Sequence, residues 1–220
     1  MLARFQSVGL VAIALCAGMA ASPALASTNL VANGYFSQPD PSTYNESGWN
    51  LAASIPDWTS NTTDSIETGL NSTYGLGSYL GSTTNLELNA NTFGSISQTI
   101  SGLTAGDTYN LTFGYGIRGG AGAQQMLVSI GGVDLGTLNA PSDATSSWDA
   151  EYFSFTATGA SELLTFTSNN VGGNAAEGNE LTAVSLTAAP EPMSWVLMLT
   201  GFAGVGGALR LGRRNLGIAA

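Results

Sequence analysis

Enzymatic chemistry in this chain would depend on carboxylates, because the usual protein nucleophiles and bases are missing. The 220 residues include no histidine and one cysteine, Cys16, which lies in an apolar stretch near the N-terminus. No lysine occurs between residues 27 and 189. Serine–histidine triads, cysteine nucleophiles, Schiff-base lysines and histidine-ligated zinc are therefore unavailable to this part of the chain.

One acidic pair could support hydrolysis. Asp149 and Glu151 are two residues apart beside a predicted strand, and we expect both carboxylates on one solvent-facing side of it. Two carboxylates at a glycosidic bond can act as the acid and the base or nucleophile of a glycoside hydrolase. A solvated acidic strand face has the same pattern, and we favour that simpler interpretation over an enzyme.

Sugar binding needs aromatic rings that pack against C–H faces, with a few polar groups for the hydroxyls. Tyr44 and Trp49 lie in a loop rich in proline and serine, where each is either a sugar platform or a loop anchor. Trp148 lies beside a predicted turn, and Arg118 begins a glycine loop. These four are the candidate ligand residues. Arg118 could hold a uronate carboxylate or form a structural ion pair.

Calcium is a second candidate ligand, because oxygen donors are abundant. Two acidic pairs are spaced to share an ion: Asp64 with Glu67, and Glu177 with Glu180. No EF-hand loop and no Gly-Gly-x-Gly-x-Asp repeat occurs in the chain. These pairs therefore indicate a candidate metal site from composition alone.

The charge balance restricts the partners. Arg118 is the only basic residue between residues 27 and 189, against fourteen carboxylates, which gives this region a net charge of −13. Such a surface repels phosphate groups, so nucleic-acid binding is excluded. Cations, glycans and basic partners stay compatible with it.

The elements that must position these residues are short strands. Apolar residues alternate with polar ones in several runs, separated by Gly, Asn, Ser and Asp, and no long stretch has the helical period. The predicted strands cover residues 107–117, 124–130, 133–138, 151–157, 164–168 and 181–187. This pattern predicts an all-β, two-sheet antiparallel jelly-roll sandwich. Residues 38–50 and 169–179 are expected to be long surface loops.

A group of short motifs points to a family. They are the opening Asn29-Leu-Val-Ala-Asn-Gly-Tyr-Phe36, Ile55-Pro-Asp-Trp58, Ser97-Gln-Thr-Ile100, the run 106–113 and Phe153-Ser-Phe-Thr-Ala157. In this order they resemble DUF642-type and related galactose-binding-like domains of cell surfaces. Many of those domains hold a structural calcium ion. The residues implied as ligands differ here: Ser37 replaces an acidic residue, and Leu181-Thr-Ala-Val-Ser-Leu186 lacks the expected Asp and Asn.

The N-terminus resembles a secretory signal peptide over residues 1–26. Arg4 precedes an apolar segment, and Ala24 and Ala26 form a small-x-small cleavage site. We therefore expect export through the Sec translocon, cleavage by signal peptidase and a sandwich domain over residues 27–188.

The C-terminus has three parts in a fixed order. The first part is Pro190-Glu191-Pro192. The second is an uncharged stretch over 193–209, which contains Trp195 and which we expect to be a transmembrane helix. The third is a basic segment over 210–214 with Arg210, Arg213 and Arg214. Together, residues 189–214 resemble the PEP-CTERM sorting signal of Gram-negative bacteria. The resemblance implies a transient inner-membrane anchor, cleavage by an exosortase and delivery to the cell surface or an exopolysaccharide matrix.

The expected function is that of an exported, non-catalytic surface or matrix protein, with polysaccharide as the candidate ligand. Two alternatives stay open: a structural or adhesive protein that binds no sugar, and a carboxylate glycoside hydrolase.

Overall fold

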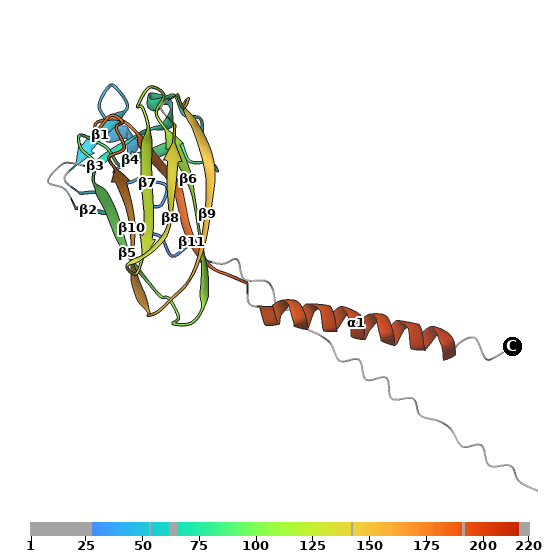
Figure 1. Cartoon of the computed structure of the whole chain (residues 1–220). Coiled ribbons are helices and arrows are strands. Elements are labelled where there is room, and N and C mark those ends of the chain that lie inside the picture. Colours follow the sequence, from blue (N-terminus) through green and yellow to red (C-terminus); the bar gives the residue numbers. More distant parts are fainter. Residues whose placement is uncertain (1–27, 53, 62–65, 142, 191, 216–220) are drawn as a thin grey trace, which may run out of the picture.

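Two antiparallel sheets packed face to face form the body of the protein (Figure 1). The computed structural model describes residues 28–52, 54–61, 66–141, 143–190 and 192–215. The signal peptide with Ala24 and Ala26, the metal candidate Asp64, and Glu191 of the sorting motif lie outside these residues.

The larger sheet has six strands in the order β1-β3-β4-β11-β6-β9. Its bounds are β1 Trp49–Ala52, β3 Ile66–Leu70, β4 Thr84–Glu87, β11 Asn179–Ala188, β6 Thr108–Ile117 and β9 Ser147–Thr156. Strands β1 and β9 are therefore its two edges.

The second sheet has five strands in the order β2-β5-β10-β7-β8. Its bounds are β2 Thr59–Ser60, β5 Ser95–Ser101, β10 Ser161–Asn169, β7 Gln124–Ile130 and β8 Val133–Ala140. A turn at Gly131-Gly132 joins β7 to β8, and the two glycines have positive φ values of 57° and 80°.

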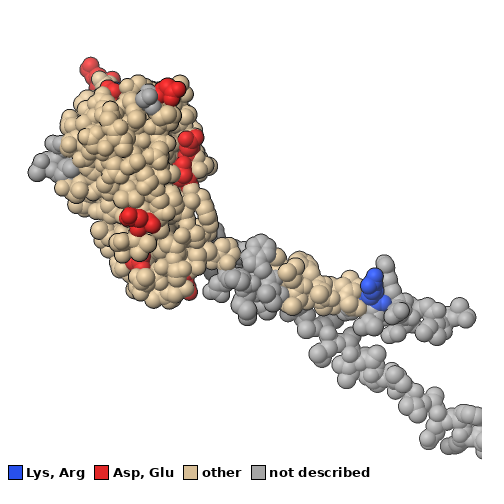
Figure 2. All heavy atoms as spheres, viewed as in Figure 1, with Lys and Arg blue, Asp and Glu red and all other residues tan. Residues whose placement is uncertain are grey.

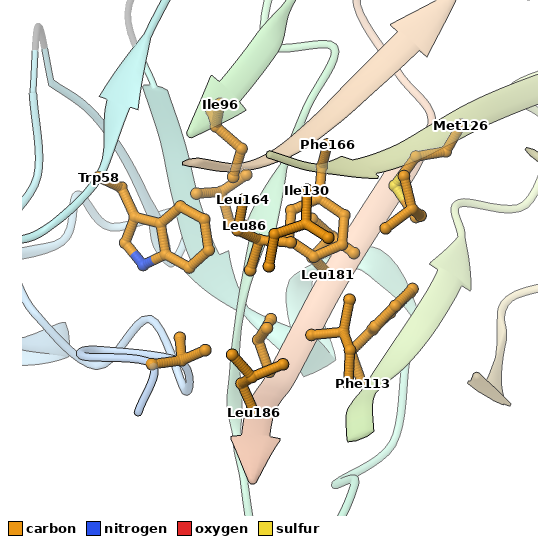
Figure 3. Packing of buried hydrophobic residues seen from close by; sticks show 14 of the residues in the cluster. Trp58, Leu86, Ile96, Phe113, Met126, Ile130, Leu164, Phe166, Leu181 and Leu186 are labelled. Atoms are coloured by element: carbon orange, nitrogen blue, oxygen red, sulfur yellow. The ribbon is translucent and has the colours of Figure 1, made fainter. Parts of the chain in front are cut away.

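The core lies between the two sheets (Figure 3). Phe113 and Leu181 from the larger sheet meet Phe166 and Met126 from the smaller one, and each is at most 1% exposed. The rings of Phe113 and Phe166 pack edge to face with centroids 5.1 Å apart. Trp58 is 2% exposed and belongs to the same core.

The predicted all-β antiparallel sandwich is confirmed, and the six predicted strands correspond to β6 to β11. These strands were visible in the sequence because apolar and polar residues alternate over most of their length. The loop expected over 38–50 contains a short 3-10 helix, η1 Pro41–Thr43, and ends where β1 begins at Trp49.

One helix, α1 Pro192–Asn215, follows the sandwich and contains the predicted span 193–209. Within the described part of the chain, no helix is both long and apolar enough to cross a membrane.

Candidate functional site

A line of five residues crosses the outer face of the six-stranded sheet, at the end where β11 begins. The strand register places Glu67 of β3 opposite Glu87 of β4, Glu87 opposite Glu180 of β11, Glu180 opposite Gly116 of β6, and Gly116 opposite Trp148 of β9. Residues directly opposite each other share one face of a sheet. Their neighbours along the strands, such as Leu86 and Leu181, point into the core.

The three glutamates of this line, which we call the glutamate row, are buried. Glu180 and Glu87 are 0% and 2% exposed. Glu180 accepts a hydrogen bond from the Asn85 amide at 2.7 Å, and Glu87 accepts one from the Gly178 N–H at 2.6 Å. One further oxygen of each carboxylate has no hydrogen-bond partner. Burial of three carboxyl groups side by side is unfavourable in free energy, so the residues around the row must stabilise it.

Arg118 supplies the positive charge at this row. Its guanidinium lies 3.6 Å from an oxygen of Glu87 and 3.7 Å from one of Glu177, and it stacks over the Tyr74 ring at 5.3 Å from the ring centre. Its contacts are thus ionic on two sides and aromatic on the third. Of the two roles considered for Arg118, the structure shows the ion pair.

The pKa values of the row are raised. Burial, and next the charge of Glu67, raise the pKa of Glu87 to about 8. Burial, followed by the charges of Glu87 and Glu67, raises the pKa of Glu180 well above its usual value. With a pKa of about 8, Glu87 is largely protonated at neutral pH, which limits its repulsion with the other two glutamates.

Residues 71–79, which we call the roof segment, cover the row. The segment begins with the short 3-10 helix η2, Asn71–Tyr74. The Tyr74 hydroxyl donates to Glu67 at 2.5 Å, and the Asn71 amide donates to the carbonyl of Gly77 at 3.0 Å. The Trp148 indole N–H donates to the same carbonyl at 2.8 Å. The roof segment is thereby joined both to the row and to β9.

Two half-buried aromatic rings lie on glycines at the β9 end of this line. A Cβ atom on Gly116 would lie 2.6 Å from the Trp148 ring, and one on Gly114 would lie 2.8 Å from the Tyr79 ring. The two ring centres are 6.0 Å apart with planes tilted by 45°. Since glycine leaves this face of β6 bare, both rings lie close against the sheet and keep part of their surface accessible.

Asp149 and Glu151 lie on the opposite face of β9 from Trp148. They pair with Tyr115 and Phe113 of β6, whose side chains point inward. The two carboxylates share one face, as expected, but it is the face of the inward Phe153 and not the outer face, because they lie an even number of positions from Phe153. At this sheet edge Asp149 is exposed and Glu151 is half-buried. They line the mouth of a cleft of about 120 Å³ between the sheets, with Tyr115, Leu138 and Asn139 among its other lining residues.

We call Trp148, Tyr79, Asp149 and Glu151 the β9 rim. Edge strand β9 carries Trp148 on one face, where Tyr79 of the roof segment packs beside it, and the two carboxylates on the other face. Burial, and next the charge of Asp149, raise the pKa of Glu151. The charge of Glu151 in turn raises the pKa of Tyr79, after the larger effect of burial. The two faces of the rim are thus electrostatically coupled around the edge.

The structure does not bring all four candidate ligand residues together. Trp49 is on β1 and Trp148 is on β9, at opposite edges of the same sheet. Five interstrand spacings of about 4.8 Å separate these edges by roughly 24 Å. Tyr44 is half-buried near β1, with a hydroxyl that is enclosed and unpaired. Burial is the main cause that raises its pKa. Arg118 and Trp148, in contrast, both contact the roof segment.

The described residues do not fit a calcium ion. Glu177 pairs with Arg118, Glu180 takes the Asn85 amide, and Glu67 takes the Tyr74 hydroxyl. Among the residues that can be placed, no group of three or more acidic side chains is arranged to hold a metal.

One position of the segment Leu181–Leu186, which lacks the acidic residue that the resemblance leads one to expect, is held by a hydroxyl group. Thr182 donates its hydroxyl to the Thr84 carbonyl at 2.7 Å, and Thr84 donates its own to the Tyr35 carbonyl at 2.6 Å.

Sequence reasoning did not identify Glu87, Tyr74 or Tyr79 as part of a site. One signal was available for Tyr79: Gly114 and Gly116 share a face of β6, and bare positions on a strand leave room for large neighbours. For Glu87 no signal existed, because the strand register that aligns the three glutamates cannot be read from their spacing.

A larger hollow of about 600 Å³ lies elsewhere, between the N-terminal segment and β5. Its lining is rich in hydroxyl groups, including Ser97, Thr99 and Ser101. Trp58 borders it, but that ring belongs to the core and donates its N–H to the Asn33 carbonyl. The hollow therefore offers no aromatic face to a sugar.

Comparison with solved structures finds several sandwiches of similar outline. They include the C-terminal domain of the sugar-binding protein EclA (24% identity, TM-score 0.35, 41% of this chain and 64% of that one). TmCBM61, solved with β-1,4-galactotriose, matches at 13% identity and TM-score 0.40, over 74% of this chain and 100% of that one. CBM35 from Paenibacillus barcinonensis matches at 20% identity and TM-score 0.38, over 66% and 95%. This chain thus spans less than two thirds of the EclA domain.

No curated protein matches the sequence. The sequence profile of a family described as "Protein of unknown function (DUF642)" matches residues 29–187, which include nearly the whole sandwich. Because this match covers most of the 220 residues, the chain belongs to the DUF642 family.

Proposed function

We propose that this protein is an exported, non-catalytic domain that binds polysaccharide at the β9 rim. The observation that carries the proposal is the Trp148–Tyr79 pair, which lies on bare glycines of β6, while two carboxylates lie on the other face of the edge strand that carries Trp148. Aromatic faces take the C–H surface of a pyranose ring, and carboxylates accept hydrogen bonds from its hydroxyls.

The rim is fixed before any ligand arrives. The indole N–H of Trp148 is held by the Gly77 carbonyl, and the roof segment that supplies Tyr79 is tied to the sheet through Tyr74 and Asn71. A ring whose position is already set loses little conformational entropy on binding.

The arrangement of the carboxylates favours binding over hydrolysis. A glycoside hydrolase places two carboxyl groups on either side of the scissile bond. Asp149 and Glu151 come from one strand and line one wall of the cleft, whereas Leu138, Asn139 and Ala140 of β8 also line it. Among the described lining residues no third carboxylate faces the pair.

Loss of the rings tests the proposal. We expect Trp148→Ala and Tyr79→Ala each to weaken binding roughly tenfold or more in affinity electrophoresis against xylan, galactan, β-glucan and chitosan, since truncation of an aromatic anchor at a binding surface costs about 2 kcal/mol or more. Tyr35→Ala is the matched control, because Tyr35 is 48% exposed and its backbone meets β4, three strands from β9.

Equal retardation of all three variants would contradict the proposal. Absence of retardation for the unmodified protein, together with self-association in the absence of sugar, would favour the structural or adhesive alternative instead.

We also propose that the tail is a sorting signal. Support comes from the order of its parts in the sequence: Pro190 to Pro192, then Trp195, then an uncharged stretch, then the arginines. The proposal does not rest on α1, for which no membrane span is found among the described residues. It gives the sandwich a route to the cell surface or a matrix, where polysaccharide is present.

A further inference from the structure

We propose that the β9 rim selects glycans that carry free amino groups and rejects glycans that carry carboxylates. This inference rests on the proposed function and adds the chemical class of the ligand. Its basis is an uncompensated pair of carboxylates that line a small cleft, on the other face of the edge strand from the aromatic pair.

The carboxylates of the rim have no counter-charge in the protein. Arg118 is the one basic residue of the sandwich, and its guanidinium is already shared by Glu87 and Glu177 on the outer face of the sheet. Over the described ranges, neither Asp149 nor Glu151 takes part in a salt bridge. A ligand must therefore supply any positive charge that this position receives.

The local environment favours such a charge. The pKa of Glu151 is raised by burial and by Asp149, which means that its ionised form lacks stabilising partners. Burial, then Glu151 and Asp149, also raise the pKa of the Tyr115 hydroxyl in the same cleft. An ammonium group between the two carboxylates would remove this repulsion and form charge-assisted hydrogen bonds with them.

The size of the cleft fits a substituent and not a whole oligosaccharide. Its volume of about 120 Å³ is well below the roughly 300–1,000 Å³ of a site that encloses a drug-sized ligand. Leu138 and Ala140 give it an apolar wall, and Asn139 adds an amide. A sugar chain that crosses the edge strand could therefore place an amino group at the carboxylates while a neighbouring ring contacts Trp148.

The same charges act against uronic acids. The surface seen in Figure 2 has red acidic atoms on the sandwich, and the blue basic atoms in that view lie on the helix. A sugar carboxylate at the rim would meet two like charges with no available cation. The uronate contact considered for Arg118 would have to displace the protein's own glutamates.

The experiment compares three hexamers of similar length by isothermal titration calorimetry with the full protein at about pH 6, where sugar amines are largely protonated. The hexamers are of glucosamine, N-acetylglucosamine and galacturonate. We expect the glucosamine hexamer to bind at least roughly tenfold more tightly than the N-acetylated one, and the galacturonate hexamer to show no binding.

Charge-neutral variants of nearly equal size identify the residues responsible. In the Asp149→Asn/Glu151→Gln double variant we expect the preference for the amine to disappear while the N-acetylated hexamer still binds. Asp134→Asn, an exposed carboxylate near the other end of β8, is the matched control and should keep the preference.

Two outcomes are distinguishable. If the unmodified protein binds the N-acetylated hexamer as tightly as the amine, or binds the uronate, the charge selection is wrong while polysaccharide binding stands. If none of these hexamers nor any polysaccharide of the panel binds, the proposed function itself fails.

Discussion

Arg118 is the residue on which the buried charges of this domain most depend. It faces Glu87 and Glu177 and stacks on Tyr74, so its removal would leave the buried Glu87, once ionised, with no compensating cation. Its side chain is one-third exposed, which reduces the effect relative to a fully buried ion pair.

We expect Arg118→Gln to lower the free energy of unfolding by about 1–3 kcal/mol in urea denaturation at about pH 9, where Glu87 is ionised. Adding Glu87→Gln should restore part of the loss, because the second change removes the carboxylate that was left unpaired. If the losses caused by Arg118→Gln and Glu87→Gln simply add in the double variant, the two side chains are not energetically coupled.

At the residue scale the sequence indicated which residues could take part in a site more readily than which residues would contact them. Trp148 and Arg118 were recognisable as candidates, one as an aromatic residue beside a turn and the other as the single basic residue of the domain. Their shared contact with the roof segment depends on Tyr74 and Gly77, which only the folded chain brings to them. The face of Asp149 was misjudged although strand alternation alone places it on the same side as Phe153.

Among the elements, the glutamate row together with the roof segment makes the fold sensitive to pH. The folded-state pKa of Glu87 is about 8, above its ordinary value of 4.5. A raised pKa means that the folded state binds the proton more tightly than the unfolded state. The contribution of Glu87 to stability is therefore complete below about pH 4.5 and is lost as the pH rises through about 8.

We expect the free energy of unfolding to fall by a few kcal/mol between about pH 5 and about pH 8, as urea denaturation at a series of pH values would show. Glu87→Gln should flatten this part of the curve, because glutamine keeps the shape and cannot ionise. A stability that rises with pH over this range, in both proteins, would contradict the assignment.

The elements also show what the sequence could reveal of the fold. Strands β6 to β11 were predicted because one face is apolar and the other polar. Strand β4 was not, since all four of its residues, including Asn85 and Glu87, are buried. Its outward face is covered by the roof segment, so polar residues there do not mark exposure. Strand β2 has two residues and gives no period at all.

At the scale of the whole molecule, we expect both terminal segments to be cleaved from the sandwich during export. Mass spectrometry of the native surface protein should show a chain that starts near Ser27 and ends near Pro190–Pro192. A surface form that retains Trp195 and the arginines Arg210 to Arg214 would refute the sorting proposal and leave the binding proposal intact.

The whole-molecule claim that matters most is that a glycan lies across β9 and not at another part of the sandwich. The four tryptophans, Trp49, Trp58, Trp148 and Trp195, provide one indole N–H signal each in an isotope-labelled protein. They sample the β1 edge, the core, the β9 rim and the tail. Titration with the tightest-binding glycan of the panel, followed by NMR, reports on all four at once.

We predict that the Trp148 indole signal moves in proportion to saturation, while those of Trp58 and Trp49 stay in place. A titration that shifts Trp49 and leaves Trp148 unchanged would place the ligand at the opposite edge of the sheet and contradict this account.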